Sequence, residues 1–338
     1  MKILITGGAG YIGSHTIIEI IQNTDWEIIS LDNYSNSSEE TYGRIEKITG
    51  KRVKYYNVDL KDLEETQRVF DENSDIDGII HFAAFKAVGE SVEQPLMYYD
   101  NNINGLNNIL RCQAKYKVSN LIFSSSCSVY GNVEELPVTE ESTLSKSESP
   151  YAYTKQIGEV MVEDFIKANK DLKAISLRYF NPVGAHFTGF NGELSSTSPN
   201  NLVPFITQTA IGKLEKLTVF GSDYDTKDGT CVRDYIHVSD IANAHVLALK
   251  YLLNGDAVLK HDIINLGTGV GVTVLEAINA FEKVSGKDLN YSIGKKRAGD
   301  VAAIYANNEK ARRLLGWKPK YNLEDMMLSA WKWEQYIF

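Results

Sequence analysis

The sequence of 338 residues is poor in cysteine and has no spacing typical of metal ligands. Its three cysteines, Cys112, Cys127 and Cys231, are too few and too scattered for a disulfide framework or a zinc site. No Cys-x-x-Cys or His-x-x-His pair occurs in the chain. We therefore expect no metal centre and no fold that depends on disulfides.

The chain also lacks a basic face and a long hydrophobic run. Its formal net charge is −9, and the cluster Lys295-Lys-Arg297 is too short for the many phosphate contacts that a nucleic acid requires. No apolar run approaches about 18 residues, and the first residues have the pattern of a strand and not of a signal peptide. We expect a cytoplasmic protein that binds neither nucleic acid nor membranes.

Short apolar runs alternate with segments of helical period through the first half of the chain. Such alternation predicts right-handed βαβ units and a parallel sheet covered on both faces. It weakens after about residue 181, where a stretch rich in Gly, Ser, Asn and Pro follows. The fold class is therefore α/β: a doubly wound Rossmann domain at 1–181 and a smaller mixed α/β substrate domain at 182–338, some of whose elements return to the main sheet. The predicted strands of the first part are 2–6, 27–31, 52–57, 78–82, 120–125 and 173–179, and its helices are 11–22, 39–48, 62–71, 95–116 and 151–169.

A glycine-rich turn lies between the first predicted strand and the first predicted helix. Gly7, Gly10 and Gly13 let the backbone approach a pyrophosphate, and the helix N-terminus supplies N–H donors and a partial positive charge. Asp32 ends the second predicted strand, where a carboxylate accepts hydrogen bonds from both adenosine ribose hydroxyls and repels a 2′-phosphate. A glycine triad alone is a weak signal, but with Asp32 it predicts an NAD site in preference to an NADP site.

A tyrosine and a lysine share one face of another predicted helix. The spacing of Tyr151 and Lys155 is i, i+4, whereas Tyr153 lies about 200° from Tyr151 around the helix and cannot share that face. An ammonium close to a phenol favours the phenolate, which a general base requires. Ser126 ends the fifth predicted strand and can hydrogen-bond into the same cleft. Each feature alone also fits an ordinary turn or surface helix, but together with the glycine turn they predict a catalytic site.

These motifs resemble the extended short-chain dehydrogenase/reductase family, and most closely its members that epimerise UDP-hexoses. The resemblance runs nearly end to end. The longer matching segments are Thr6-Gly-Gly-Ala-Gly-Tyr-Ile-Gly-Ser-His15, His81-Phe-Ala-Ala-Phe-Lys-Ala-Val-Gly-Glu-Ser91, Tyr98-Tyr-Asp-Asn-Asn102, Arg178-Tyr-Phe-Asn-Pro-Val-Gly-Ala185 and Asp228-Gly-Thr-Cys-Val-Arg-Asp-Tyr-Ile-His-Val238.

The resemblance implies an isomerase that interconverts UDP-glucose and UDP-galactose by inversion at C4, through a transient 4-keto sugar and with NAD as cofactor. It implies that Tyr151 takes the proton of the 4-hydroxyl, that Ser126 relays it and that Lys155 holds the nicotinamide ribose. The implied cofactor contacts are Gly7, Gly10, Tyr11, Ile12, Gly13, Asp32, Asn33, Asn36, Asp59, Leu60, Phe82, Ala83, Lys86, Asn101, Tyr151, Lys155 and Tyr179.

The resemblance also implies a UDP-sugar site in the second part of the chain. Arg233 and Arg297 would pair with the diphosphate, because the guanidinium fork suits phosphate oxygens. Asp300 would bind the uridine ribose. The full implied set is Ser126, Tyr151, Asn181, Asn201, Phe220, Arg233, Tyr235, Arg297 and Asp300.

Some positions separate related activities. Cys127 and Ser128 stand where related 4,6-dehydratases have an Asp-Glu pair, which argues against dehydration. The resemblance implies that side-chain bulk near Ile304 decides whether N-acetylated sugars fit. The matching family position is either Ile304 or Tyr305, so acceptance of those sugars is left open. The alternatives are a UDP-N-acetylglucosamine or UDP-glucuronate 4-epimerase and a non-catalytic NAD-binding regulator. The family pattern further implies a homodimer that packs through helices 95–116 and 151–169.

Overall fold

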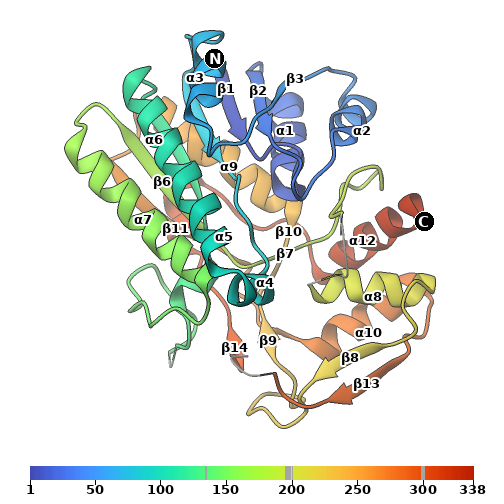
Figure 1. The fold of residues 1–338 in the computed structure, drawn as a ribbon. Coiled ribbons are helices and arrows are strands. Elements are labelled where there is room, and N and C mark those ends of the chain that lie inside the picture. The colour runs from blue at the N-terminus through green and yellow to red at the C-terminus, as the bar shows by residue number, and fades with distance from the viewer. Residues whose placement is uncertain (134, 195–198, 200, 298–300) are drawn as a thin grey trace.

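Seven parallel strands form the central sheet of the protein (Figure 1). The computed structural model describes residues 1–338 except 134, 195–198, 200 and 298–300. The strand order is β11-β6-β5-β4-β1-β2-β3, so the sheet grows outward from β1 in both directions. The prediction of an α/β doubly wound fold is confirmed. The strands are β1 (Lys2–Thr6), β2 (Glu27–Asp32), β3 (Lys54–Asn57), β4 (Gly78–His81), β5 (Asn120–Ser126), β6 (Lys173–Tyr179) and β11 (His261–Leu266).

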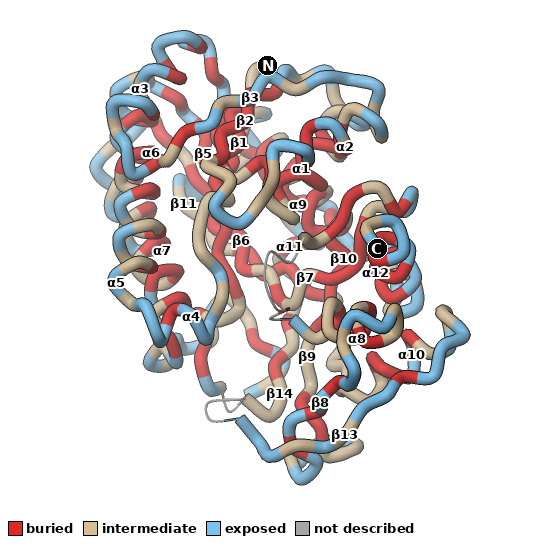
Figure 2. Tube along the Cα trace, turned by 45° about the vertical axis from the view of Figure 1, so that its right-hand side comes forward, coloured by how far each residue is buried: buried red, intermediate tan, exposed pale blue. Residues whose placement is uncertain are grey.

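Helices cover both faces of the sheet, because alternate strand residues point to opposite sides. Ile3 and Ile5 belong to one hydrophobic core and Leu4 to the other. The strands from β6 to β2 in the sheet order are therefore buried over most of their length, whereas the edge strand β3 is largely exposed (Figure 2). The first core is covered by α1 (Tyr11–Asn23), α2 (Glu40–Thr49), α9 (Val238–Leu253) and α11 (Glu309–Leu315). The second is covered by α3 (Leu63–Asp71), α6 (Gly105–Lys115) and α7 (Pro150–Ala168).

The second half of the chain contributes both to the sheet and to a separate core. β11 pairs with β6, and α9 packs against α1, so these elements complete the Rossmann part. The domain boundary at 181/182 stays a prediction. A third core lies below the carboxyl edge of the sheet in Figure 1. It is built with α8 (Leu202–Ile211), α10 (Val274–Ser285), α12 (Leu323–Ile337), β8 (Leu217–Phe220) and β13 (Tyr291–Gly294).

Short strands connect the two parts at the carboxyl edge. β7 (Asn181–Val183) pairs with β10 (Tyr235–His237), although the stretch after residue 181 is predicted to be a loop. The pairing partner lies more than 50 residues along the chain, which explains why the local pattern does not predict the strand. Another small sheet joins β9 (Val232–Arg233) to β12 (Val272–Thr273) and to β14 (Ala303–Ile304).

The predicted continuous helix 95–116 is wrong in its middle. It consists of α5 (Pro95–Tyr99), a π-helix at Asp100–Asn104 and then α6, preceded by the unpredicted α4 (Val88–Glu93). The Asn102 side chain accepts from Phe85 N at 2.8 Å and donates to Phe85 O at 3.0 Å, which ties this irregular turn to the loop after β4. A short π-helical segment within an α-helix often occurs at a functional site.

Candidate active site

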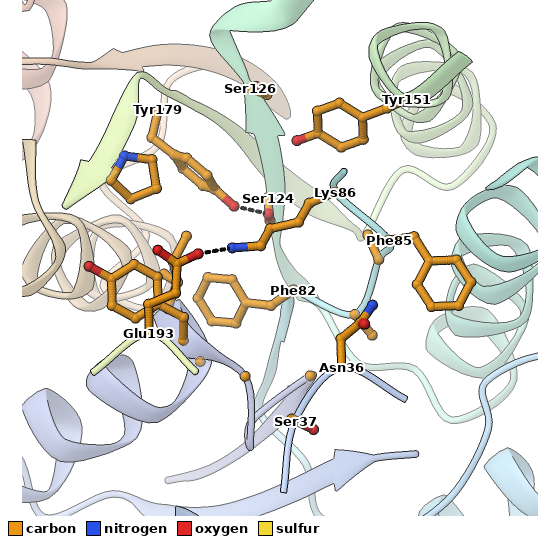
Figure 3. Close-up of a pocket in the computed structure, with 18 of the residues that line it drawn as sticks. Asn36, Ser37, Phe82, Phe85, Lys86, Ser124, Ser126, Tyr151, Tyr179 and Glu193 are labelled. Carbon is orange, nitrogen blue, oxygen red and sulfur yellow. Dashed lines mark hydrogen bonds and ion pairs between the residues drawn. The ribbon is translucent and has the colours of Figure 1, made fainter. Parts of the chain in front are cut away.

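A cavity of about 490 Å³ opens along the carboxyl edge of the sheet. Parallel strands bring their carboxyl ends to one edge, which is where ligands bind in such folds. All of the residues that the sequence predicts for the cofactor line this cavity, from Gly7 in the first turn to Tyr179 at the end of β6. Figure 3 shows side chains from several strand ends converging on it.

The glycine turn is packed so closely that side chains do not fit. Gly7 has a φ of +71°, and a Cβ there would lie 2.7 Å from Ala83 N. A Cβ at Gly13 would lie 2.2 Å from the carbonyl oxygen of Gly7. The helix α1 begins directly after Gly10, so its first N–H groups lie at the cavity wall formed by Tyr11 and Ile12. This cradle fits a pyrophosphate.

Asp32 is held at the end of β2 by three donors. Its Oδ2 accepts from Ala9 N at 2.9 Å, and its Oδ1 accepts from Tyr34 N at 2.9 Å and from Ser37 Oγ at 2.8 Å. The carboxylate therefore has a defined orientation beside the glycine turn, and it lines the cavity. A fixed anion here fits the two hydroxyls of an NAD ribose. Ser37 also lines the cavity and was missed by sequence reasoning, because its role depends on the loop after β2.

Tyr151 and Lys155 face the cavity from the start of α7. The helix begins with Ser149, whose side chain accepts from Ala152 N at 3.2 Å, and with Pro150 in its first turn. Tyr151 and Lys155 are buried, while Tyr153 is 48% exposed. Ser126 ends β5 opposite Tyr151 and also lines the cavity (Figure 3). The structure thus brings the three predicted catalytic residues together.

Burial dominates the electrostatics of this group. It raises the pKa of Tyr151 to about 12, against the opposing effect of a hydrogen bond with Ser126. It lowers the pKa of Lys155 to about 8, against the opposing charge of Glu159. The Lys155 ammonium donates to the carbonyl oxygen of Ser124 at 2.6 Å. The expectation that Lys155 brings the phenol pKa down is therefore not met by these two residues alone, because desolvation of the phenolate outweighs the attraction.

Two polar pairs span the cavity walls. The Tyr179 and Ser124 hydroxyls share a hydrogen bond between β6 and β5 (Figure 3). Lys86 forms an ion pair with Glu193 at 2.5 Å, and the same carboxylate oxygen accepts from Asn201 Nδ2 at 3.0 Å. Sequence reasoning found Lys86, Asn201 and Tyr179 but missed Glu193. Ser124 lies two residues before the predicted Ser126 in the same strand, and this run of serines was the available signal.

The predicted substrate residues divide into two groups. Asn181, Asn201 and Arg233 line the cavity together with Ser126 and Tyr151. The Arg233 guanidinium donates to the carbonyl oxygens of Val232 at 2.9 Å and Val301 at 2.7 Å. The structure places the others elsewhere or does not describe them: Tyr235 is buried in the third core, Arg297 lies over the ring of the exposed Phe220 at 4.7 Å, and Asp300 lies outside the described residues.

The positions that separate related activities lie on the cavity wall. Ile304 lines the cavity. The ring of the next residue, Tyr305, instead packs against Gly271 in a different loop, where an added Cβ would lie 3.1 Å from the ring. Cys127 and Ser128 follow Ser126 on the wall and bring no carboxylate. In the part of the chain that the structure describes, no group of three His, Cys, Asp or Glu side chains could hold a metal ion, and none of the helices is long and apolar enough to cross a membrane.

Comparisons with known proteins agree with this geometry. A family model described as GDP-mannose 4,6 dehydratase matches residues 4–329. The UDP-glucose 4-epimerase of Bacillus subtilis (strain 168) is 50% identical over 334 residues, which cover 99% of this chain and 97% of that protein. The chain belongs to the UDP-glucose 4-epimerase family. The resemblance to the extended short-chain dehydrogenase/reductases is thereby confirmed.

Solved structures of this family share the whole fold. The UDP-glucose 4-epimerase of Stenotrophomonas maltophila, with bound NAD and formylated UDP-arabinopyranose, has a TM-score of 0.96 and 43% identity and covers 100% of this chain and 98% of its own. The enzyme of Bifidobacterium longum, in complex with NAD+ and UDP, has a TM-score of 0.93 and 45% identity, with 99% and 98% covered. The family's fold therefore extends over both parts of this chain.

Proposed function

We propose that this protein interconverts UDP-glucose and UDP-galactose by inverting C4 of the sugar, with NAD as cofactor and a transient 4-keto sugar. One observation carries the proposal: Ser126, Tyr151 and Lys155 meet in the same cavity as the glycine turn and Asp32. A regulator that only binds NAD would have no use for a buried Tyr–Lys pair next to a serine. One relative with bound NAD and a UDP-sugar and another with NAD+ and UDP support the same assignment.

The catalytic residues act on the 4-hydroxyl of the sugar. Tyr151, as the phenolate, accepts the proton of this hydroxyl when the sugar is oxidised and gives it back when the 4-keto sugar is reduced on its other face. Ser126 hydrogen-bonds the same oxygen and relays the proton in both directions. Lys155 holds the nicotinamide ribose with the donors that Ser124 does not use. NAD, when bound, supplies the hydride acceptor and a positive ring that opposes the effect of burial on the Tyr151 pKa.

The substrate end of the cavity holds the UDP part. Arg233 offers a charged donor fork to the diphosphate, and Asn181 and Asn201 present amides on the same wall. Ile304 borders the space for the sugar, and its intermediate size favours the C2-hydroxyl sugars as the main pair. Arg297, Phe220, Tyr235 and Asp300 remain candidates only through the family resemblance.

The protein is proposed to act as a homodimer in the cytoplasm. Apolar side chains are exposed on neighbouring helices: Val92 on α4, Leu96 on α5, which is 78% exposed, and Tyr153 and Val160 on α7. An exposed apolar set over adjacent helices is typical of a subunit contact. Light scattering of the purified protein and of Leu96→Asp tests this: the variant should become monomeric, and a wild-type monomer would refute the dimer.

Product analysis tests the activity. UDP-galactose is incubated with the purified protein, without added cofactor, and UDP-glucose is measured. Tyr151→Phe should lower the rate by about 10²–10⁴-fold, because the reaction loses its general base. Tyr153→Phe is the matched control on the same helix and should leave the rate unchanged. No conversion by the wild type, even after NAD is added, would refute the substrate assignment.

A further inference from the structure

Helix α7 presents three polar residues to the sheet at intervals of four: Tyr151, Lys155 and Glu159. All three are buried, and the spacing stacks them on one face of the helix. The serines of β5 meet this face. Lys155 donates to the backbone oxygen of Ser124 at 2.6 Å, and Ser125 Oγ donates to Glu159 Oε1 at 2.5 Å. The strand therefore holds the helix in one register.

Glu159 is also held from β6 by a bidentate ion pair. Arg178 Nε donates to Oε1 at 2.8 Å, and Arg178 Nη2 donates to Oε2 at 2.6 Å. Both side chains are almost fully buried, and the guanidinium lies over the Tyr130 ring at 4.9 Å. A buried pair of this kind is often no more stabilising than apolar side chains of the same volume, so stability alone gives little reason for it.

Lys155 needs a nearby anion because its ammonium is buried. Among the described residues, the partners of Lys155 other than Glu159 are neutral: the Ser124 carbonyl, the Phe123 ring and the His81 imidazole. Burial keeps the pKa of His81 low, at about 3, and raises those of Tyr151 and Cys127 to about 12 and that of Tyr179 further. The titratable and charged groups on the elements packed here come from α7 (Tyr151, Glu159), β4 (His81), β6 (Arg178, Tyr179) and the short helix after β5 (Cys127).

We propose that Glu159 is a positioning residue of the reaction, which keeps Lys155 charged beneath the cofactor ribose and keeps Tyr151 opposite Ser126. Arg178 and Ser125 fix the carboxylate, so that it acts on Lys155 through space without capturing its donors, which stay available for the ribose. The role of the charge rests on the proposed function, whereas the geometry and the protonation of Lys155 do not. A carboxylate one helical turn from a buried ammonium favours its charged form.

The first test measures the pKa of the Lys155 side chain directly. Lysine side chains of the NAD-loaded protein are titrated by NMR, and the Lys155 signal is assigned from its loss in Lys155→Met. In Glu159→Gln the pKa of Lys155 should fall by about one unit, because an anion near the ammonium is removed. Glu334→Gln is the matched control, since Glu334 is equally buried and pairs with Lys213 at 2.8 Å far from the site. It should leave Lys155 unchanged.

The second test asks whether this charge matters to the reaction. In Glu159→Gln the alkaline limb of the kcat profile should move to lower pH by a similar amount, while Glu334→Gln loses stability without such a shift. An unchanged Lys155 titration in Glu159→Gln, or an equal shift in both variants, overturns the proposal. So does a limb that stays in place, which would leave Glu159 a purely structural role. An inactive wild type instead refutes the proposed function, and the titration still decides the role of Glu159.

Folding of the variant does not limit the test. If Glu159→Gln fails to fold, Glu159→Met with Arg178→Met removes both buried charges and restores apolar packing. The Lys155 titration should then shift in the same direction but by less, because a more distant cation has also gone. A double variant with the wild-type titration overturns the proposal.

Discussion

The two ends of the cavity are built in different ways. The dinucleotide end uses turns that directly follow β1, β2 and β4, so its residues lie within the first part of the chain in strand order. The proposed UDP-sugar end gathers Asn181 from the three-residue strand β7, Asn201 from the loop before α8, and Arg233 and Ile304 from two-residue strands. Backbone packing defines the first end, and long-range side-chain contacts define the second. We expect the first to tolerate almost no change of shape and the second to respond in graded steps.

The largest effect should come from Gly13→Ala in the dinucleotide end. The added Cβ would lie 2.2 Å from the Gly7 carbonyl oxygen, so the turn must open and α1 must shift. We expect a loss of about 2–3 kcal/mol in the free energy of unfolding and a protein purified without NAD. Denaturation and extraction of bound nucleotide measure both. Gly43→Ala on α2 is the control, since nothing lies within 4 Å of its Cβ. Normal NAD content in Gly13→Ala would remove the contrast between the two ends.

Arg233→Lys should weaken the substrate end alone. The variant keeps the charge but loses the donor fork. We expect the KM for UDP-galactose to rise about 10- to 100-fold while NAD content stays the same, because a charge-assisted hydrogen bond contributes about 1.5–3 kcal/mol. Arg52→Lys, on the exposed surface, serves as the control. A loss of NAD in Arg233→Lys would mean that the two ends are not independent.

Ile304→Ala should change the choice of sugar and little else. Shortening this wall side chain enlarges the part of the cavity in which we propose that the sugar binds. The ratio of kcat/KM for UDP-N-acetylgalactosamine to that for UDP-galactose should rise about tenfold, because the variant lacks three carbons at the pocket wall and even one methylene commonly changes discrimination by about this factor. Tyr305→Phe should leave the ratio unchanged, because that ring packs toward Gly271. Equal rates on both sugars in the wild type would contradict our preference for the C2-hydroxyl pair.

The smallest effect concerns stability in acid, and it compares a buried histidine behind the dinucleotide end with one on β10, which pairs with the strand that starts at Asn181. His245 packs against Phe82 and Tyr179 behind the dinucleotide site, and burial lowers its pKa to about 4. His237 stacks on Phe187, and burial lowers its pKa to about 3. The unfolded chain binds these protons first, so stability is full above pH 6.5 and falls as the pH drops toward the folded-state values.

In His245→Leu and in His237→Leu, the free energy of unfolding should fall less steeply with decreasing pH, by up to about 1.4 kcal/mol per pH unit. Urea unfolding between pH 7 and pH 5 measures the slope. Similar changes of this slope in both variants would show that the folded protein suppresses protonation of the two histidines to the same extent, so that the two ends do not differ in this respect. An unchanged slope would show that the histidine in question already titrates normally in the folded protein.

The sheet and its carboxyl edge could be predicted from the sequence, because both depend on patterns within short stretches of the chain. A buried strand, a glycine turn and a helix follow one another at residues 2–22, and the carboxyl ends of parallel strands must meet at one edge. The period of 3.6 residues places Tyr151 and Lys155 on one helix face and turns Tyr153 away, as its exposure confirms. Spacing alone could therefore place the glycine turn, Asp32, Ser126 and the Tyr151–Lys155 pair along one edge of the sheet, whereas the other predicted cofactor residues came only from the family resemblance.

Contacts between segments that are distant in the sequence could not be predicted in the same way. Helix 95–116 has an unbroken helical pattern, yet Asn102 bonds to Phe85 and the helix contains a π-turn. Glu193 meets Lys86 from a loop more than 100 residues away, and Tyr235 faces a core and not the cavity. Membership of a site is set here by contacts between distant segments, which no local period encodes.

Residue type and spacing were enough for the fold class and for placing Ser126, Tyr151 and Lys155 at one cleft, because backbone geometry repeats over a few residues. The family and the chemistry proposed for these residues came from the longer matching segments of the sequence. The three-dimensional packing set the protonation of these groups: burial raises the Tyr151 pKa and lowers that of Lys155, and Glu159 opposes the shift at Lys155 from a position fixed by Arg178 on another strand. Desolvation and charge pairing depend on what surrounds a side chain in space, and those neighbours come together only in the folded chain.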